Sequence, residues 1–431
     1  MYWEKEETLP RKELEELQLK RLKWVVRHVY DNVPFYREAL KQRNVHPDDI
    51  KKLEDISKLP FTTKEDLRAN YPFGLFAVSL DKVVRIHTSS GTSGKPKVVG
   101  YTASDIERWA NMVARCLYMV GVRKGDIFQN ISNYAFFTGG LGFHMGAEKL
   151  GAVTIPAGVG NTERQVQCMV DFGTTVIHST PSYALHLKEV AEEMGVIDKI
   201  KLKMGCFGAE PWSENTRKRL EDAFGIKAYD SYGLSEMNGP GVAFECQEQE
   251  GLHIWIDHYF VEVVDPKTGE RLSDGEKGEL VLTTLTKEAM PLLRYRTGDV
   301  TFLIDDECSC GRTHPKIHRI IGRTDDMIIV RGINVFPSQI EHVLMRIPEV
   351  GDNFQVVITR KGSLDELKVR VELKDELFTG ELSDLERIVQ KIQKELQKEL
   401  NLRAEVELVE KGTIERSTGK AKRVLDLRGE L

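Results

Sequence analysis

The sequence has little of what marks several protein classes. Only 6 of its 431 residues are cysteine, which excludes a disulfide scaffold and makes a reducing cytoplasm the expected location. Basic residues are not in excess: 61 Lys and Arg stand against 67 Asp and Glu, for a net charge of −6, which argues against a dedicated nucleic-acid binder. No long apolar run is present either. The longest stretch without Asp, Glu, Lys or Arg, residues 127–147, holds two asparagines, a glutamine and four glycines, so it indicates a buried pocket wall and not a membrane span.

The rest of the composition is that of an ordinary globular protein. Hydrophobic residues make up 41% and charged residues 30% of the chain, and this length predicts two or three domains. Glu4 and Lys5 follow Tyr2 and Trp3 where a secretory signal would place an apolar segment, so none is expected. We find no internal repeat and no low-complexity tract.

The first 80 residues indicate a helical segment. Apolar residues recur at helical spacing between charged ones, at Leu14, Leu17, Leu22, Val25, Val26 and Val29. Asn32-Val33-Pro34 is expected to end this helix, because proline disfavours helical backbone in the residue before it. Such a stripe packs on the protein's own core or on a partner subunit. We therefore expect residues 1–80 to be helical, with a homodimer contact as one use of that surface.

Between residues 83 and 300, short apolar runs alternate with helical patterns. The runs predict strands at 83–86, 151–156, 175–178 and 203–207. Helices are expected at 105–120 and 181–194. This alternation is typical of an α/β layered domain, and residues 279–284 then predict an antiparallel strand.

After residue 324 the pattern changes to that of a compact α+β unit. It predicts helices at 337–346 and 382–400, a hairpin of 354–359 with 367–373, and a last strand at 404–409. The expected fold class is α/β. A large layered N-terminal domain of sheets and helices, residues 1–324, would precede a small, mobile α+β domain, residues 325–431.

The segment from Thr88 to Lys97, Thr-Ser-Ser-Gly-Thr-Ser-Gly-Lys-Pro-Lys, is the strongest local signal. Its glycines allow backbone N–H groups to converge, and its hydroxyls and Lys95 add donors and charge, as polyphosphate oxygens require. The spacing is not that of a Walker A loop, and Pro96 follows the lysine. A flexible surface turn is the alternative.

This loop resembles the phosphate loop of the adenylate-forming superfamily, which includes acyl-CoA synthetases, adenylation domains and luciferases. Other motifs of that superfamily follow in order: Tyr232-Gly233-Leu234-Ser235-Glu236, Tyr295-Arg296-Thr297-Gly298-Asp299, Gly322-Arg323-Thr324-Asp325-Asp326 and Gly419-Lys420. Within the superfamily the chain most resembles the phenylacetate–CoA ligase family. That likeness is carried by residues 31–36, 137–142, 146–148, 207–212 and 331–337.

The resemblance implies a reaction in two halves. A carboxylate attacks the α-phosphorus of ATP and releases diphosphate, and the thiol of coenzyme A then attacks the acyl-adenylate and releases AMP. No side-chain nucleophile is needed, because the protein's work is positioning and charge stabilisation. ATP, Mg²⁺ and coenzyme A are therefore the expected cofactors.

The resemblance also assigns the nucleotide site. The β- and γ-phosphates would be held by Ser90, Gly91, Thr92, Ser93, Gly94 and Lys95. The adenine wall would come from Gly208, Ala209, Glu210, Pro211, Asp230, Ser231, Tyr232 and Gly233, with Tyr232 stacking on the base. Glu236 would ligate Mg²⁺ through oxygen, and Ser235 would touch the α-phosphate. Asp299 would accept both ribose hydroxyls, and Arg323 would cover the ribose.

Three further roles follow from the same likeness. Lys420 would bridge the carboxylate and the α-phosphate during adenylation, since a point charge there stabilises the charge that develops. Asp325 would be the hinge about which the small domain turns between the half-reactions. Arg331 and Gly332 would face the pantetheine arm of coenzyme A.

The acid pocket is expected in the uncharged stretch. Aromatic walls would come from Tyr134, Phe136 and Phe137, with space left by Gly139 and Gly140. By resemblance, Ala209 would lie near the carboxylate and Pro240 near the ring. The alternative is that these aromatics are plain core.

A possible metal site lies outside these motifs. Cys246, His253, Cys308 and Cys310 supply three thiols and one imidazole, a set that suits tetrahedral structural zinc. His314 and His318 are rival ligands, and four unrelated reduced residues are the alternative. Cys116, Cys168 and Cys206 are expected in the core.

The expected function is an AMP-forming aryl-acid–CoA ligase, with phenylacetate as the leading acid. Adenylation without CoA transfer is an alternative, as in the enzyme that adenylylates a deazaflavin coenzyme; so is a CoA ligase for another aryl acid such as indoleacetate. A silent nucleotide-binding regulator is disfavoured, because Glu236, Asp299, Arg323 and Lys420 are all present. The expected partners are small molecules and a second copy of the chain, with no nucleic acid and no membrane.

Overall fold

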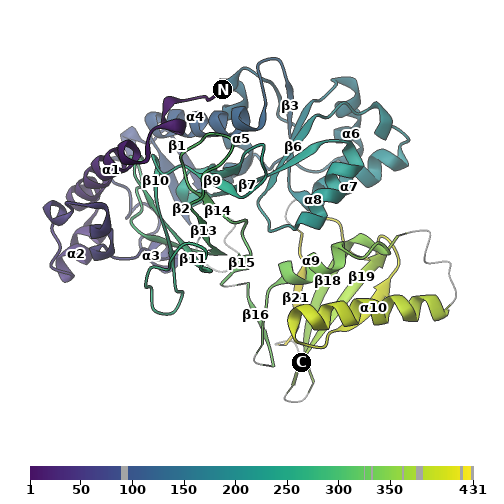
Figure 1. The fold of residues 1–431 in the computed structure, drawn as a ribbon. Helices are drawn as coiled ribbons and strands as arrows, with labels where there is room; N and C mark the ends of the chain where they lie inside the picture. Colours follow the sequence, from purple (N-terminus) through teal and green to yellow (C-terminus); the bar gives the residue numbers. More distant parts are fainter. Residues whose placement is uncertain are drawn as a thin grey trace. The chain divides into compact units, whose positions relative to one another are not determined.

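The computed structural model describes residues 1–88, 96–324, 326–331, 333–361, 364–374, 382–417 and 421–428. Two compact units can be distinguished along the chain (Figure 1). The first comprises Met1–Gly158, Thr174–His178 and Tyr229–Arg319. The second comprises Val159–Gly173, Ser179–Ala228 and Ile320–Leu431.

The first unit begins with helical elements, as expected. These are η1 (Lys5–Thr8), α1 (Arg11–Asn32), α2 (Pro34–Gln42), η2 (Pro47–Asp49), η3 (Leu53–Lys58), α3 (Lys64–Ala69) and η4 (Leu80–Lys82). Helix α1 ends at Asn32 and Pro34 opens α2, with Val33 extended between them. The buried stripe of α1 includes Gln18, which donates to the carbonyls of Ile256 and Tyr259 at 3.1 Å. At least this stripe therefore packs on the protein's own core.

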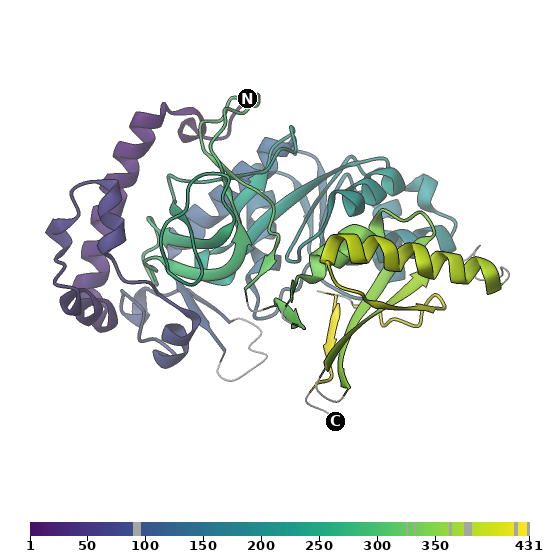
Figure 2. The same cartoon turned by 60° about the horizontal axis from the view of Figure 1, so that its bottom comes forward.

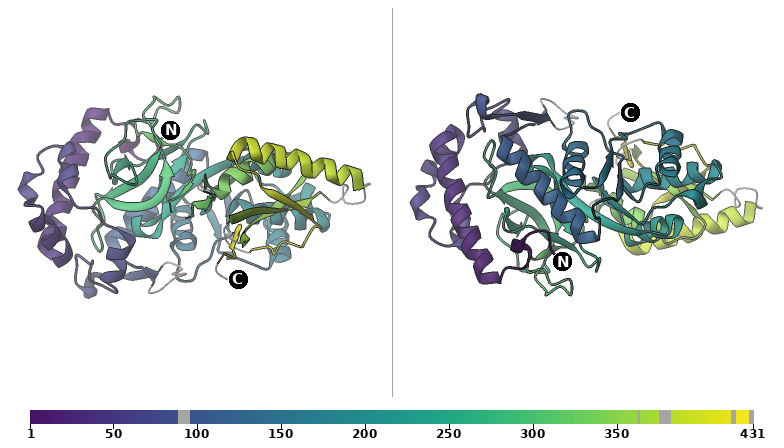
Figure 3. Two further views of the ribbon diagram at one scale, coloured as in Figure 1. Left: turned by 90° about the horizontal axis from the view of Figure 1, so that it is seen from below. Right: turned by 90° about the horizontal axis from the view of Figure 1, so that it is seen from above.

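Two strands and a pair of helices follow. Strands β1 (Arg85–Thr88) and β2 (Val98–Tyr101) pair antiparallel. Helix α4 (Ala103–Val120) starts with a capping box of Thr102 and Asp105. It lies beside α5 (Thr138–Leu150), as Figure 3 shows. This contact is close, because a Cβ added at Gly146 would lie 2.5 Å from Val113.

The strands of the first unit form parallel and antiparallel groups. Strands β3 (Ile127–Asn130), β4 (Val153–Ile155) and β5 (Val176–Ser179) pair in parallel. An antiparallel series runs through β7 (Lys227–Leu234), β8 (Gly239–Glu245), β9 (Leu252–Ile254), β14 (Lys316–Ile317) and β13 (Leu303–Ile304). A second antiparallel group consists of β10 (Tyr259–Val264), β11 (Gly278–Thr284) and β12 (Tyr295–Thr301). The short element η6 (Ser235–Met237) joins β7 to β8.

The second unit contains helices and its own sheets. Its first part has α6 (Thr162–Asp171), α7 (Pro181–Glu193), η5 (Ile197–Lys199), β6 (Met204–Gly208) and α8 (Glu214–Phe224). Its second part has β15 (Gly322–Arg323), β16 (Ile328–Val330), β17 (Ile333–Val335), α9 (Pro337–Met345), β18 (Val350–Lys361), β19 (Leu364–Leu373), α10 (Leu382–Leu400), β20 (Glu405–Val409) and β21 (Val424–Asp426).

The C-terminal sheet of this unit has the order β20-β19-β18-β21. Helices α9 and α10 pack with it around one apolar core (Figure 2). That core includes Ile340, Leu344, Val356, Val369 and Ile392. The α+β character expected after residue 324 is confirmed, and the hairpin and long helix lie where the sequence placed them.

The predicted elements thus agree with the structure to within a few residues. The boundary between residues 324 and 325 stays a prediction. Cys116 and Cys206 are buried as expected, whereas Cys168 on α6 is only half-buried. Within the described part of the chain, no helix is long and apolar enough to cross a membrane.

Candidate active site

Strands β1 and β2 bring together the two ends of the glycine-rich loop. Thr88 stands opposite Val98 in their register. The loop residues Ser90, Gly91, Thr92, Ser93, Gly94 and Lys95 themselves lie outside the described residues. The loop is therefore anchored on a short hairpin, and its phosphate-binding role stays a prediction.

Glu236 on η6 lies among buried polar groups of the first unit and is only 3% exposed. Lys97, just after the loop, forms an ion pair with its carboxylate, and the Tyr295 hydroxyl donates to Oε1 at 2.9 Å. Burial alone would raise the pKa of Glu236, but Lys97 and these hydrogen bonds outweigh it and the pKa is lowered. Glu236 is therefore a buried carboxylate that stays ionised, and such a group can bind a cation through its oxygens.

A second lysine, which is buried, reaches the same motif. Lys287 Nζ donates to the Glu236 carbonyl at 3.4 Å and lies 4.5 Å from the centre of the Tyr101 ring. Burial lowers the pKa of Lys287 to about 8, against the opposing pull of Asp105 and Glu236. The backbone of the motif is fixed as well, because the Tyr101 hydroxyl donates to the carbonyls of Ser235 and Asn238 at 3.3 and 3.0 Å.

Tyr232 and Asp299 come from different strands and meet in the buried interior. The Tyr232 hydroxyl donates to Asp299 Oδ2 at 2.7 Å, and the two residues are 8% and 5% exposed. Thr297 Oγ1 accepts from the Asp299 backbone at 3.0 Å. Two residues predicted to hold the nucleoside are thus neighbours. Nearby, Gly233 approaches the β8 backbone so closely that a Cβ would lie 2.2 Å from the Gly239 carbonyl.

The remaining residues of the predicted adenine wall lie on strands and turns. Asp230 and Ser231 are buried on β7, and the Asp230 backbone donates to Glu245 Oε2 at 2.7 Å. Gly208 ends β6, and Ala209 after it has a left-handed φ of 70°. Pro211 is exposed. Their contact with adenine stays a prediction.

Glu210 joins two segments of the second unit. Its Oε1 accepts from the backbone of Ser182 at 2.9 Å, and its Oε2 accepts from the backbone of Ala421 at 3.1 Å. Ala421 directly follows Lys420, which lies outside the described residues. The carboxylate that the sequence assigned to the adenine wall therefore also holds the chain next to the predicted adenylation lysine.

Around the predicted hinge, only part of the site is described. Asp325 and Gly332 lie outside the described residues. Arg323 Nε lies 3.7 Å from Asp326 Oδ2. Arg331 is exposed, has a left-handed φ of 51°, and donates to the Asp365 carbonyl at 2.9 Å.

The predicted acid-pocket residues of the first unit lie near the start of α5. Pro240 lies against this helix, because a Cβ at Gly142 would be 2.5 Å from its Cγ. A Cβ at Gly139 would meet nothing within 4 Å, whereas one at Gly140 would lie 2.6 Å from the Asn133 carbonyl. Gly139 therefore leaves open space, and Gly140 allows a close backbone approach.

The three predicted aromatics have different surroundings. The Tyr134 hydroxyl accepts from Asn130 at 2.7 Å and lies 3.2 Å from His144 Nδ1, and burial raises its pKa to about 12. Phe136 is 71% exposed, so it is not a core residue here. Phe137 is half-buried just before α5. Their contact with an acid stays a prediction.

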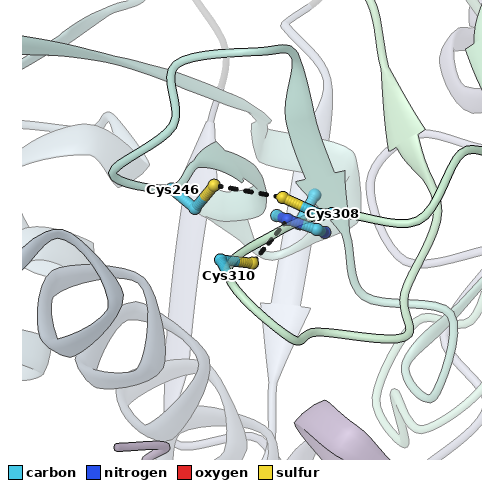
Figure 4. Close-up of side chains that lie close together, drawn as sticks. Cys246, Cys308 and Cys310 are labelled. Atoms are coloured by element: carbon cyan, nitrogen blue, oxygen red, sulfur yellow. Dashed lines mark hydrogen bonds between the residues drawn. The ribbon is translucent and has the colours of Figure 1, made fainter.

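The four predicted metal ligands form one cluster in the first unit. The ligand atoms of Cys246, His253, Cys308 and Cys310 all lie within 4.8 Å of one another. Figure 4 shows the cysteine side chains turned toward one another, with 3.7 Å between the sulfurs of Cys246 and Cys308. His253 Nε2 lies 3.3 Å from the Cys310 sulfur. The four side chains are therefore spatial neighbours, and their binding of a metal stays a prediction.

The neighbours of the cluster fit it for a metal. His253 Nδ1 donates to the His314 carbonyl at 2.9 Å, which leaves Nε2 as the ligating atom. His314 accepts from the Ile256 backbone through Nδ1 at 3.1 Å, and its Nε2 donates to the Glu6 carbonyl at 3.0 Å, so both its nitrogens are engaged. His318 stacks on Phe302. Neither rival belongs to the cluster.

The N-terminal segment rests on the loop that carries Cys308 and Cys310. The Tyr2 hydroxyl donates to the Cys310 carbonyl at 3.1 Å. Arg312 Nε lies 2.7 Å from Glu7 Oε2 in a buried ion pair, and Thr313 donates to the carbonyls of Glu7 and Leu9. A ligand that holds the loop of Cys308 and Cys310 in place would therefore also hold the first residues of the chain in place.

Two family descriptions match the chain: "AMP-binding enzyme" over residues 5–285 and "AMP-binding enzyme C-terminal domain" over residues 332–428. The phenylacetate-coenzyme A ligase of Thermus thermophilus is 49% identical over 99% of this chain and 100% of its own length. The chain belongs to the phenylacetate–CoA ligase family. The ligase of the same name from Escherichia coli is 48% identical over 98% of this chain and 97% of its own.

The chain is also similar in structure to a solved CoA ligase. The 2-hydroxyisobutyryl-CoA ligase in the postadenylation state, in complex with 2-HIB-AMP, has a TM-score of 0.93 and 33% identity. The similarity covers 98% of this chain and 91% of that one. The adenylate-forming fold expected from the motifs, with its large N-terminal and small C-terminal domain, is thereby confirmed.

Sequence reasoning missed the groups that control Glu236. The sequence motifs assign no role to Lys97, and they include Tyr295 without a function of its own. A signal for Lys97 existed, since a cation two residues beyond a phosphate loop lies near its mouth. Lys287 gave no signal, because nothing in its local pattern distinguishes it from a surface lysine.

Proposed function

We propose that the protein catalyses the ATP-dependent joining of phenylacetate to coenzyme A. The products would be phenylacetyl-CoA, AMP and diphosphate, with phenylacetyl-adenylate as the intermediate. The near full-length similarity to phenylacetate–CoA ligases carries this proposal. The buried, ionised Glu236 and the Tyr232–Asp299 pair lie at the motifs that the reaction requires.

In the first half-reaction, a carboxylate oxygen of the acid attacks the α-phosphorus, and the bond to the diphosphate breaks. Glu236 would hold Mg²⁺ on the phosphates, and Lys97 would then be released from the ion pair to face the nucleotide. Asp299, oriented by Tyr232, would accept the ribose hydroxyls. Lys420 would stabilise the charge that develops between the acid and the α-phosphate.

In the second half-reaction, the sulfur of coenzyme A attacks the acyl carbon and AMP leaves with the bonding electrons. Arg331 and Gly332 would face the pantetheine arm, and Asp325 would be the hinge residue. The acid would lie near Tyr134, Phe137 and the open space at Gly139.

We also propose that the Cys246, His253, Cys308 and Cys310 cluster binds structural zinc. Three thiolates and one imidazole within 4.8 Å complete a tetrahedral set. Such a set leaves no open position for a substrate, so the metal would stabilise the loop and take no part in the ligation. A bound metal would link the end of β8, strand β9 and the loop that carries Cys308 and Cys310.

A homodimer and a cytoplasmic location remain part of the proposal. The first is tested by light scattering of the purified protein, where the mass of one chain, 49.0 kDa, would contradict it. The second is tested by fractionation of cells that express the protein.

Lys420→Ala separates the two half-reactions. The variant should form almost no adenylate from phenylacetate and ATP, yet should make thioester from supplied phenylacetyl-adenylate and coenzyme A. Lys422→Ala, an exposed lysine two residues away, is the matched control. Equal loss of both half-reactions in Lys420→Ala would contradict the assigned role.

A further inference from the structure

The turn that carries Glu236 is too short to satisfy its own backbone. Element η6 spans the 3 residues Ser235–Met237, and Asn238 ends it with a left-handed φ of 85°. The last carbonyls of a helix have no partner within it, and in so short a turn this applies to every carbonyl. Glu236, Met237 and Asn238 are buried, and a buried carbonyl without a hydrogen bond is costly. The turn therefore depends on partners from other segments.

Two buried tyrosines supply most of these partners. The Tyr259 hydroxyl donates to the Met237 carbonyl at 2.6 Å. The Tyr101 hydroxyl lies 3.0 Å from the Asn238 carbonyl and 3.3 Å from the Ser235 carbonyl, so its one proton is shared between them. Neither tyrosine is more than 1% exposed, so water does not compete for these carbonyls.

The carbonyl of Glu236 itself is contacted by a charged group. Lys287 Nζ donates to it at 3.4 Å and lies 4.5 Å from the centre of the Tyr101 ring. The next residue, Glu288, is held through its backbone N–H, which donates to Asp105 Oδ1 at 2.7 Å. Each carbonyl from residue 235 to residue 238 thus has a side-chain partner from a distant segment.

The two tyrosine rings are themselves held in place. Tyr101 ends β2 and stacks on Trp109, with ring centres 5.3 Å apart and an angle of 16° between the rings. Tyr259 begins β10 and stands opposite Thr284 of β11 in the antiparallel register. A hydroxyl fixes a backbone group only when its own ring is fixed, and both rings meet this condition.

Glu236 needs a fixed backbone because its side chain is expected to change partners. The carboxylate is paired with Lys97 here, and binding of Mg²⁺ would replace one cation by the other. A side chain in a binding site is effective only when it is held within roughly 0.5 Å of its working position. The carbonyl contacts do not involve the carboxylate, so they can persist through this exchange.

We propose that Tyr101 and Tyr259 are positioning residues for the Mg²⁺ ligand Glu236. Their hydroxyls hold the backbone of residues 235–238, and the carboxylate thereby stays in place while Mg²⁺ replaces Lys97. This inference rests on the proposed function, because it needs Mg²⁺ at Glu236. Loss of both hydroxyls should therefore weaken the contribution of the metal to nucleotide binding.

Isothermal titration of α,β-methylene-ATP, an analogue whose α–β linkage cannot be cleaved, measures that contribution. The titration is run once with excess Mg²⁺ and once with EDTA. The metal factor is the dissociation constant in EDTA divided by that in Mg²⁺. Glu236→Gln removes the charged ligand and should lower the metal factor by about 5-fold or more, the lower end of common couplings between two ligands.

Tyrosine-to-phenylalanine variants keep the rings and remove only the hydroxyls. Tyr101→Phe and Tyr259→Phe should each lower the metal factor, and the double variant should bring it close to the value of Glu236→Gln. The affinity measured in EDTA should stay nearly unchanged. Tyr183→Phe is the matched control, because this tyrosine is equally buried and its hydroxyl lies 3.0 Å from that of Thr162. It should lower the melting temperature and keep the metal factor.

The outcomes separate this inference from the proposed function. If Glu236→Gln lowers the metal factor while the double variant keeps that of the unchanged protein, the inference is overturned. An equal drop in Tyr183→Phe would also overturn it, because the effect would then be a general consequence of losing a buried hydroxyl. Should the double variant not fold, the two single variants decide in the same way. An unchanged metal factor in Glu236→Gln would contradict the assignment of Mg²⁺ to Glu236, and this inference would fall with that part of the proposed function.

Discussion

Tyr232→Phe tests the buried pair at the predicted ribose site. The change removes one oxygen and leaves the ring, so the packing of β7 should persist while Asp299 loses a donor at 2.7 Å. A hydrogen bond to a charged group contributes about 1.5–3 kcal/mol. Because Asp299 is proposed to accept the ribose hydroxyls, part of this energy should appear as weaker binding of Mg·ATP.

The full amount corresponds to an affinity loss of about 10- to 150-fold at roughly 1.4 kcal/mol per tenfold change. Titration with Mg·ATP and with its 2′-deoxy analogue measures it. The unchanged protein should prefer ATP, and Tyr232→Phe should lose most of that preference, since a misoriented Asp299 no longer distinguishes the hydroxyl.

Tyr183→Phe is the matched control, because it removes a hydroxyl that lies 3.0 Å from the neutral hydroxyl of Thr162. It should lower stability by about 0.5–1.5 kcal/mol and leave nucleotide binding unchanged. If Tyr232→Phe bound both nucleotides within twofold of the unchanged protein, the assignment of Asp299 to the ribose would be refuted.

Three further changes have defined outcomes. Replacing Cys308 and Cys310 by serine should reduce zinc from one atom per chain to none and lower the melting temperature; metal analysis with unchanged content would refute the site. Arg312→Leu leaves the buried Glu7 carboxylate without its cation, with only the backbones of Trp3 and Glu4 still donating to it, which should cost about 3–5 kcal/mol in chemical denaturation. Burial lowers the pKa of His178 to about 3, so its contribution to stability is complete above pH 6.5 and is lost as the pH falls toward 3. The loss should be about 2 kcal/mol at pH 5, and His178→Gln should flatten the profile between pH 6.5 and 5.

Arg11→Ala serves as the control for Arg312→Leu. Arg11 pairs with Glu15 and Asp305 on the surface, where such pairs contribute roughly 0–1 kcal/mol. Equal losses in the two variants would contradict the argument from burial. A pH profile of His178→Gln as steep as that of the unchanged protein would contradict the neutral state of the buried ring.

Regular elements were predictable where local pattern and tertiary packing agree. Spacing and turn residues alone predict the stripe of α1, its end at Asn32 before Pro34, the strand β11 and the β18–β19 hairpin. The buried side of α1 was only partly foreseen: Gln18 is buried while Leu17 is half-buried. A buried amide is tolerated at Gln18 because it donates hydrogen bonds to two backbone carbonyls of the core. The local sequence pattern gives no sign of these distant partners.

In the candidate site, too, the sequence predicts the residues but not their tertiary contacts. The order of the motifs identified Glu236, Asp299 and Tyr232. It did not predict that Lys97 and Tyr295 keep the Glu236 carboxylate ionised. Nor did it predict the hydrogen bond between Tyr232 and Asp299. These contacts join residues far apart in sequence and depend on how the strands pack.

The Cys/His cluster was predicted from residue type and spacing, since Cys246 and His253 lie seven residues apart and Cys308 and Cys310 lie two apart. Residue type could not choose between His253, His314 and His318, because all three carry the same imidazole. The choice depends on which ring nitrogens other groups already occupy, as they do in His314.

The most direct test of the proposed function measures AMP released from ATP and Mg²⁺ with a panel of acids, each with and without coenzyme A. The panel contains phenylacetate, hydroxyphenylacetates, indoleacetate, benzoate and acetate. We predict coenzyme-A-dependent turnover that is highest with an arylacetate, phenylacetate above all. No turnover with any acid, or AMP release that is indifferent to coenzyme A, would contradict the ligase and favour adenylation of a different acceptor.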